Sequence, residues 1–72
     1  MAKDRLIEII LNDMPQRVPA DCSLEALIRS LEETDPDLIV ELNGRFVYSR
    51  NYATTIVSAG DRLEFINPNF GG

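Results

Sequence analysis

Apolar side chains recur with helical spacing in only one stretch of this 72-residue chain. The positions i, i+3, i+4 and i+7, which share one face of a helix, are occupied by Leu24, Leu27, Ile28 and Leu31. Ser23 is a typical N-cap residue, because its hydroxyl can accept a hydrogen bond from a free backbone N–H. Pro36 prevents much extension, and the acidic Glu32 and Glu33 oppose the helix dipole at a C-terminus. The pattern predicts one helix of about three turns that frays at its end.

The other apolar runs alternate with polar residues, as is typical of β-strands. The expected strands are residues 5–11, 16–19, 38–42, 45–48 and 62–66. Asn12-Asp13-Met14-Pro15 supplies turn chemistry for a first hairpin, which Pro19 ends. Asn43-Gly44 predicts the turn of a second hairpin, because a type I′ turn needs positive φ at both central residues. Residues 54–57 form either a short strand or a coil packed on the core.

The predicted order is hairpin, helix, hairpin, loop, strand, which is an α+β plan. A right-handed crossover would place the first and last strands side by side at the centre of the sheet. The side chains that they would bury against the helix are Ile7, Ile9, Leu63 and Phe65. This arrangement is the β-grasp, or ubiquitin-like, roll: a mixed sheet of about five strands with one main helix packed across it.

Composition excludes several classes of function. The single Cys22 cannot form an internal disulfide, and alone it cannot hold a metal or an iron–sulfur cluster. The chain has no histidine, so imidazole catalysis and imidazole metal ligation are absent. No apolar run approaches the roughly 20 residues of a membrane span, and the N-terminus lacks the apolar region of a signal peptide. We therefore expect a cytoplasmic protein without a metal site.

Charge points to protein partners. Twelve acidic and seven basic side chains give a net charge of −5, which disfavours nucleic acid because phosphates need a basic surface. The same charge suits encounters with basic patches on other proteins, and it also serves plain solubility.

The chain ends in Asn67-Pro68-Asn69-Phe70-Gly71-Gly72. A Gly-Gly end is thin and has wide conformational freedom, so it can enter a narrow slot and present the Gly72 carboxylate as an unhindered reacting group. Many chain ends are merely frayed, so the tail alone is a weak indication of function. The domain that precedes it favours a functional interpretation. We expect residues 1–67 to form the β-grasp domain and residues 68–72 to form a flexible tail.

Several motifs, in this order and spacing, resemble the ThiS-type sulfur carriers, which are small β-grasp proteins of the thiamin pathway. The matching segments are Ile10-Leu11-Asn12, the helix start from Ser23 to Ile28, Glu41-Leu42-Asn43-Gly44, Ala53-Thr54-Thr55, Gly60-Asp61-Arg62-Leu63-Glu64 and the terminal Gly71-Gly72. The resemblance covers nearly the whole chain.

The resemblance implies a chemistry located at Gly72. A partner adenylating enzyme similar to ThiF or MoeB would activate the Gly72 carboxylate with ATP. Sulfur from a source such as a cysteine desulfurase would then convert it to a thiocarboxylate, which donates sulfur to a thiazole synthase-like acceptor. Gly71 and Phe70 would enter the partner together with Gly72. The chain would bind no cofactor itself, and it would be a protein cosubstrate rather than an enzyme.

Three other interpretations stay open. A proline shortly before Gly-Gly is also similar to the small subunit of molybdopterin synthase, the MoaD-like carriers, so the pathway that receives the sulfur is not fixed. A second possibility is a non-catalytic β-grasp docking module with an inert tail. A third is a protein modifier that is attached to lysines through Gly72.

Individual residues allow more than one interpretation. Phe70 either anchors the tail on a partner as an aromatic hot spot or folds back on the domain. Cys22 lies beside a helix N-terminus, which can lower a thiol pKa, but no basic residue adjoins it and a structural cysteine is favoured. Asp35-Pro36-Asp37 is interpreted as a solvated loop rather than a carboxylate dyad. Phe46 and Tyr48 are expected to pack on the sheet or lie on the surface.

Overall fold

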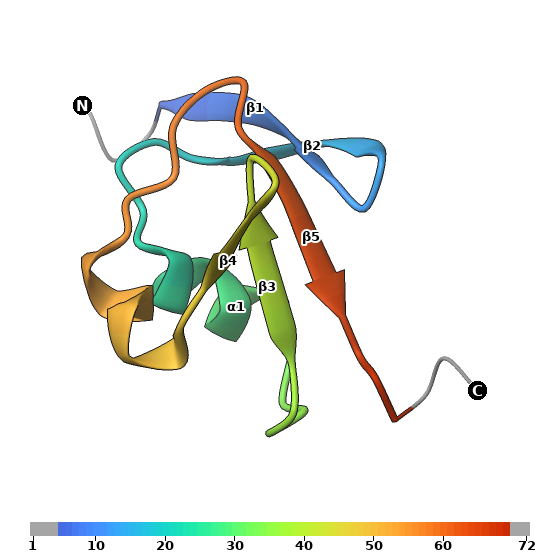
Figure 1. The fold of residues 1–72 in the computed structure, drawn as a ribbon. Helices are drawn as coiled ribbons and strands as arrows, with labels where there is room; N and C mark the ends of the chain where they lie inside the picture. The colour runs from blue at the N-terminus through green and yellow to red at the C-terminus, as the bar shows by residue number, and fades with distance from the viewer. Residues whose placement is uncertain (1–4, 70–72) are drawn as a thin grey trace.

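The computed structural model describes residues 5–69. Its elements are β1 (Leu6–Leu11), β2 (Met14–Pro19), α1 (Leu24–Ser30), β3 (Ile39–Leu42), β4 (Arg45–Val47), the 3₁₀ helix η2 (Ser49–Thr54) and β5 (Arg62–Ile66). The strands form one sheet in the order β2-β1-β5-β3-β4. β1 and β5 are parallel and the other neighbours are antiparallel, with α1 packed against one face (Figure 1). This confirms the predicted α+β roll with the first and last strands at its centre.

The core lies between the central strands and the helix. Ile9 of β1 and Leu63 of β5 are fully buried, and they pack in one cluster with Leu24 and Leu27 of α1. The other buried members of this cluster are Val18, Val40 and Val57. Ile7 and Phe65, predicted to be buried as well, are only partly buried at its margin. Alternation along the strands thus selects the residues that face the helix.

The helix is shorter than the sequence predicts. It spans seven residues, or about two turns, and the predicted apolar residue Leu31 lies at its C-cap with 37% of its surface exposed. Ser23 is the N-cap as predicted, and its Oγ accepts a hydrogen bond from the Ala26 N–H at 3.0 Å.

The expectation that the helix frays at Glu32 and Glu33 is also wrong. Glu32 adopts a left-handed φ of 57°, its N–H donates to the Arg29 carbonyl at 3.0 Å, and the Glu33 N–H donates to the Ile28 carbonyl at 3.2 Å. This pair of bonds is a Schellman motif, which usually has glycine at the left-handed position. The helix therefore ends in a defined, hydrogen-bonded stop.

The two hairpin turns have the same local conformation. Asn43 and Gly44 both have positive φ, at 53° and 81°, as predicted for a type I′ turn. Asn12 and Asp13 also have positive φ, at 50° and 69°, and Leu11 pairs with Met14. The first turn is thus two residues long, and Met14 and Pro15, predicted to lie in the turn, already belong to β2.

The segment before β5 is more regular than expected at its start. Residues 49–54 form η2, whereas the continuation is a coil with a single bridge between Ile56 and Ser23. Val57 is nonetheless buried in the core, which agrees with the predicted coil packed on the core. β4 ends at Val47, one residue earlier than predicted.

The left-handed Glu32 yields a stability prediction. Glu32→Gly should raise the free energy of unfolding by about 0.5–1 kcal/mol, because glycine adopts this φ without a Cβ penalty. Urea denaturation followed by circular dichroism measures the change. Glu25→Gly is the matched control and should instead destabilise the protein by about 1 kcal/mol, because it places glycine within the helix. A loss of stability in Glu32→Gly would contradict the strain argument.

Candidate functional site

The predicted reacting residues Phe70, Gly71 and Gly72 lie outside the described residues, and their predicted roles stay predictions. The structure does describe what precedes them. β5 ends at Ile66, which pairs with Ile39 of β3, and the chain continues through Asn67, Pro68 and Asn69. We call these three residues the tail base. The site is therefore built from β5, the tail base and the groups that hold them.

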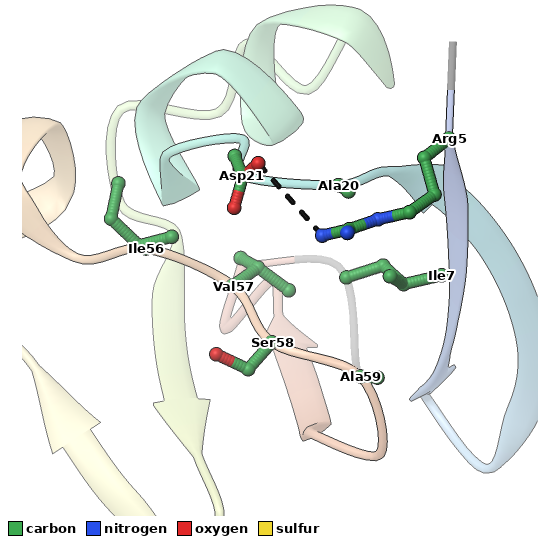
Figure 2. A pocket seen from close by; sticks show the side chains of 8 residues that line it. All are labelled: Arg5, Ile7, Ala20, Asp21, Ile56, Val57, Ser58 and Ala59. Atoms are coloured by element: carbon green, nitrogen blue, oxygen red, sulfur yellow. Dashed lines mark ion pairs between the residues drawn. The ribbon is translucent and has the colours of Figure 1, made fainter. Parts of the chain in front are cut away.

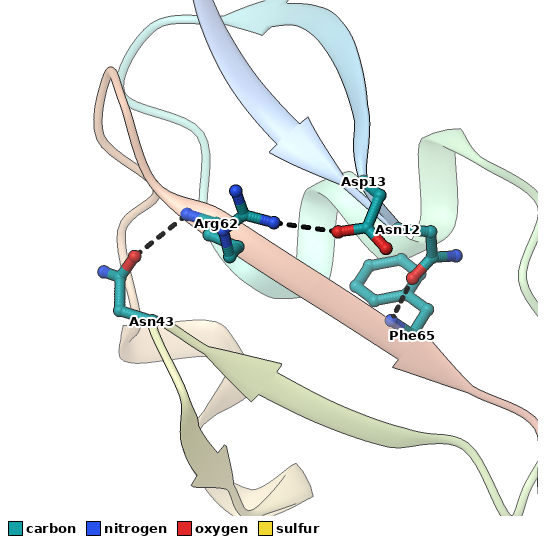
Figure 3. Close-up of polar contacts among 5 residues, drawn as sticks. All are labelled: Asn12, Asp13, Asn43, Arg62 and Phe65. Atoms are coloured by element: carbon teal, nitrogen blue, oxygen red, sulfur yellow. Dashed lines mark hydrogen bonds and ion pairs between the residues drawn. The ribbon is translucent and has the colours of Figure 1, made fainter.

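Asn12 holds β5 on the side of β1 (Figure 3). β1 pairs with β5 only at Arg62 and Leu63, and the Asn12 N–H then donates to the Leu63 carbonyl at 2.9 Å. The Asn12 Oδ1 accepts a hydrogen bond from the Phe65 N–H, also at 2.9 Å. The side chain thus continues the ladder after the β1 backbone has turned away.

Asn43 holds β5 on the side of β3. Its N–H donates to the Arg62 carbonyl at 2.7 Å, and its Oδ1 accepts from the Arg62 N–H at 2.9 Å. Its Nδ2 donates to Asp61 Oδ1 at 3.1 Å. Arg62 also pairs with Asp13 at 2.9 Å, but both side chains are largely exposed, so this ion pair contributes little. Two turn asparagines therefore secure the start and middle of the strand that leads to the tail.

The tail base is held by the loop between α1 and β3. The Asn67 Nδ2 donates to Glu33 Oε1 at 3.3 Å and to Asp35 Oδ2 at 3.0 Å. The Asn69 Nδ2 donates to Asp37 Oδ2 at 2.6 Å. Two asparagine side chains thus converge on Asp35-Pro36-Asp37, which the sequence had suggested was merely a solvated loop.

Sequence reasoning missed this contact, although a pattern for it exists. The chain contains two matched tripeptides, Asn67-Pro68-Asn69 and Asp35-Pro36-Asp37. In each, polar side chains flank a proline, and the amides of one segment are donors for the carboxylates of the other. Only the topology, which brings the β3 entrance beside the β5 exit, shows that the two segments meet.

Cys22 is not brought to the tail base. Its side chain is partly buried against the core, and its carbonyl accepts a hydrogen bond from the Val57 N–H at 2.9 Å. Burial raises the pKa of the Cys22 thiol; a backbone hydrogen bond lowers this pKa by less, and the Asp21 carboxylate adds to the rise. The geometry supports the structural interpretation of Cys22 over a reactive nucleophile.

Two aromatic side chains lie exposed near the end of β4. Phe46 and Tyr48 meet edge to face with ring centroids 4.7 Å apart, and the Arg50 guanidinium lies 4.5 Å from the centre of the Tyr48 ring. About half of each aromatic residue is exposed. These are surface residues, one of the two predicted outcomes, and the arginine adds a cation–π contact.

A small hollow lies at the start of β1 (Figure 2), lined by Arg5, Ile7, Ala20, Asp21, Ile56, Val57, Ser58 and Ala59. Its volume is about 160 Å³. Arg5 and Asp21 face each other across it at 3.9 Å, but both are mostly exposed. The hollow contains none of the residues predicted to act, and it shares no residue with the tail base.

Comparison with known proteins identifies the family. The family model described as the ThiS family matches residues 4–72. The chain belongs to the ThiS family. The predicted resemblance to ThiS-type sulfur carriers is thus confirmed.

A solved structure extends the comparison to the fold. The crystal structure of the thiamine biosynthesis protein (ThiS) from Geobacter metallireducens superimposes with a TM-score of 0.80 at 26% identity. The match covers 92% of this chain and 100% of that one. Among curated proteins, no relative matches.

Two further features of the described residues bear on other functions. Within residues 5–69, no three histidine, cysteine, aspartate or glutamate side chains are grouped so that they could hold a metal ion. No helix in this part of the chain is long and apolar enough to cross a membrane.

The role of Asn12 can be isolated by glycine substitution. Asn12→Gly removes the side-chain bond to Phe65, whereas Asp13→Gly, at the neighbouring position of the same turn, removes only an exposed ion pair. Both variants place glycine at a positive φ and so share that backbone effect, and Asn12→Gly should therefore be less stable than Asp13→Gly by about 1 kcal/mol. Denaturant titration compares the two, and equal effects would contradict the assigned role of Asn12.

The Cys22 thiol yields a prediction on pH. Because the pKa is raised in the folded state, a smaller fraction is thiolate at pH 8 than in the urea-unfolded chain, and iodoacetamide should alkylate it more slowly. Mass spectrometry of timed samples at several pH values measures the rate. The apparent pKa of the rate profile should be higher for the folded protein, and a lower one would indicate an activated thiol.

Proposed function

We propose that the protein carries sulfur for the thiazole of thiamin as a thiocarboxylate on Gly72. The observation that carries this proposal is the family match, which extends to residue 72 and so includes the Gly-Gly end. The fold is consistent with it, because the tail follows the central strand of the sheet. β5 pairs with strands on both sides at Leu63 and with β3 as far as Ile66, so it is anchored more firmly than an edge strand would be.

The first proposed step is adenylation by a partner enzyme. A carboxylate is a poor acceptor for a sulfur nucleophile, and activation with ATP removes this obstacle. An oxygen of the Gly72 carboxylate bonds to the α-phosphorus of ATP, and pyrophosphate leaves. The product is an acyl-adenylate with AMP as its leaving group. Since ATP is the cosubstrate, we propose the cytoplasm as the compartment.

The second proposed step is sulfur transfer. The outer sulfur of a persulfide on a source such as a cysteine desulfurase attacks the acyl carbon and expels AMP, which gives an acyl disulfide. A thiol then attacks the sulfur of the source in this disulfide, so that the thiocarboxylate is released and the thiol and the source are left joined as a disulfide. The resulting thiocarboxylate is ionised at neutral pH and is a strong nucleophile toward an acceptor bound to a thiazole synthase-like partner. The carrier then returns to a carboxylate and is used again. In this scheme the partners supply the transition-state stabilisation, and the chain is a cosubstrate.

The geometry of the described residues suits a presenting role. Charged groups in residues 5–69 are on the surface, and no polar or charged residue among them is buried. The side-chain oxygens of Asn12 and Asn43 accept hydrogen bonds from the backbone of β5. The side chains best fixed near the tail therefore support the strand.

Two alternatives from the sequence are kept as outcomes of the test. A MoaD-like carrier would share the activation step and differ in the acceptor. A docking module would bind partners without any reaction at its terminus. Either alternative requires a surface for a partner. The exposed side chains of Phe46, Tyr48 and Arg50 would suit such a contact, because aromatic and arginine side chains are enriched in interfaces.

The deciding experiment is intact mass spectrometry. The chain is incubated with ATP, a sulfur source and a ThiF-like adenylating enzyme. We expect the mass to rise by the replacement of one oxygen with sulfur, and fragmentation should place the change at Gly72. Omission of ATP, or deletion of Gly72, should abolish it. A terminus that stays an ordinary carboxylate with enzymes active on other carriers would refute the proposal and favour the docking module.

A further inference from the structure

The tail base contacts the loop between α1 and β3, and a role for this contact rests on the proposed function of Gly72. The backbone ladder of β5 cannot continue through Pro68, because proline has no N–H to donate. The last paired residue is Ile66. Beyond it, the chain is held by side chains, and these belong to the two residues on either side of the proline.

The acceptors for these side chains are themselves fixed in place. The Asp35 N–H donates to Glu33 Oε1 at 3.2 Å, and the Asp37 N–H donates to Asp35 Oδ1 at 2.9 Å. Glu33 in turn follows the Schellman stop of α1, where its N–H bonds to the Ile28 carbonyl. A continuous series of bonds thus runs from the core helix through three carboxylates to the tail base.

The chemistry of the pairs makes them effective restraints. Each bond joins an amide donor to an ionised acceptor, and such charge-assisted bonds are stronger than neutral ones. Glu33, Asp35 and Asn67 are half-buried, which limits competition from water at the first pair. Asparagine has a short side chain, so a bond to it restrains the backbone closely and costs little rotamer entropy.

We propose that Asn67 and Asn69 are positioning residues that set the direction in which the chain leaves the domain toward Gly72. The loop formed by Glu33, Asp35 and Asp37 is their support. A terminus that starts from a fixed direction reaches the partner's active site in fewer orientations, and small errors of placement are costly in catalysis.

The first test is kinetic and uses the full chain as the substrate of a ThiF-like adenylating enzyme. The rate of adenylation is measured by ATP–pyrophosphate exchange. For Asn67→Ala/Asn69→Ala we expect kcat/KM to fall by about tenfold or more, with a melting temperature close to that of the wild type. Asn51→Ala is the matched control, since the Asn51 side chain is exposed and forms no hydrogen bond among the contacts of residues 5–69. It should leave kcat/KM unchanged.

A second pair of variants separates bonding from charge. Asp35→Ala/Asp37→Ala and Asp35→Asn/Asp37→Asn remove the same two charges, but the asparagine oxygens can still accept the bonds. We expect kcat/KM of Asp35→Ala/Asp37→Ala to fall as far as that of Asn67→Ala/Asn69→Ala. For Asp35→Asn/Asp37→Asn we expect kcat/KM within about threefold of the wild type. Equal impairment of both pairs would overturn the positioning role, and so would normal kinetics in the alanine variants.

A third measurement does not require the reaction. In ¹⁵N relaxation experiments on the free chain, the backbone order parameter at position 69 should fall toward about 0.6 in the Asn67→Ala/Asn69→Ala variant, from a higher wild-type value. An unchanged order parameter would overturn the proposal even if kcat/KM fell in the enzyme assay. A wild-type chain that accepts no adenylate would refute the proposed function alone, because the relaxation result would still decide whether the contact restrains the tail base.

Discussion

β1 and β5, strands from opposite ends of the chain, lie parallel at the centre of the sheet, and the rest of the fold depends on this pairing. Ile9 and Leu63 bring fully buried side chains from the two strands to the face that α1 covers. On its other side, β1 pairs with β2, and β5 pairs with β3 of the second hairpin. The pairing therefore brings residues that are far apart in sequence into a single core. It also places the end of β5, where the chain leaves the domain, at the middle of the sheet.

Asparagine side chains restrain β5 and the tail base at three places, through both groups of the amide. At the two hairpin turns, Asn12 and Asn43 use their side-chain oxygens to accept bonds from β5. At the tail base, Asn67 and Asn69 use their side-chain nitrogens to donate bonds to carboxylates. Asparagine suits the turns because it tolerates left-handed backbone, and it suits the tail base because it is a neutral donor. One residue type thus restrains the chain from Arg62 to Asn69.

Much of the fold was predictable because local patterns determine it. Alternation identified the strands, and Asn43-Gly44 determined its turn through the φ values that a type I′ turn demands. The helix end was predicted poorly, since Leu31 continues the apolar stripe while a non-glycine residue, Glu32, supplies the left-handed stop. Apolar periodicity carries no information about such a stop. The first turn was predicted to include Met14 and Pro15, which belong to β2. Proline was interpreted as a turn residue there, but an edge strand such as β2 tolerates it.

The site was predictable only in part. Gly71 and Gly72 drew attention through their composition and their place at the chain end, and the family match supports that choice without describing their structure. The contacts that hold the tail base were not predictable, because Asn67 and Asp35 are distant in sequence and each is an ordinary polar residue by itself. Contacts of this kind depend on topology, which brings the β3 entrance next to the β5 exit. Side-chain partners across such a junction have no periodicity that could reveal them.

The early departure of β1 from β5 has a consequence for self-association. Past Leu63, the β1-facing edge of β5 is covered by no strand in the described chain, and only the Asn12 side chain occupies it, at Phe65. An open edge of this kind can act as a template for a strand of another molecule. Asn12 interrupts that template, because its Oδ1 already accepts the bond from the Phe65 N–H that an added strand would need. The turn asparagine therefore leaves this edge with fewer free backbone groups for pairing with a strand of another copy.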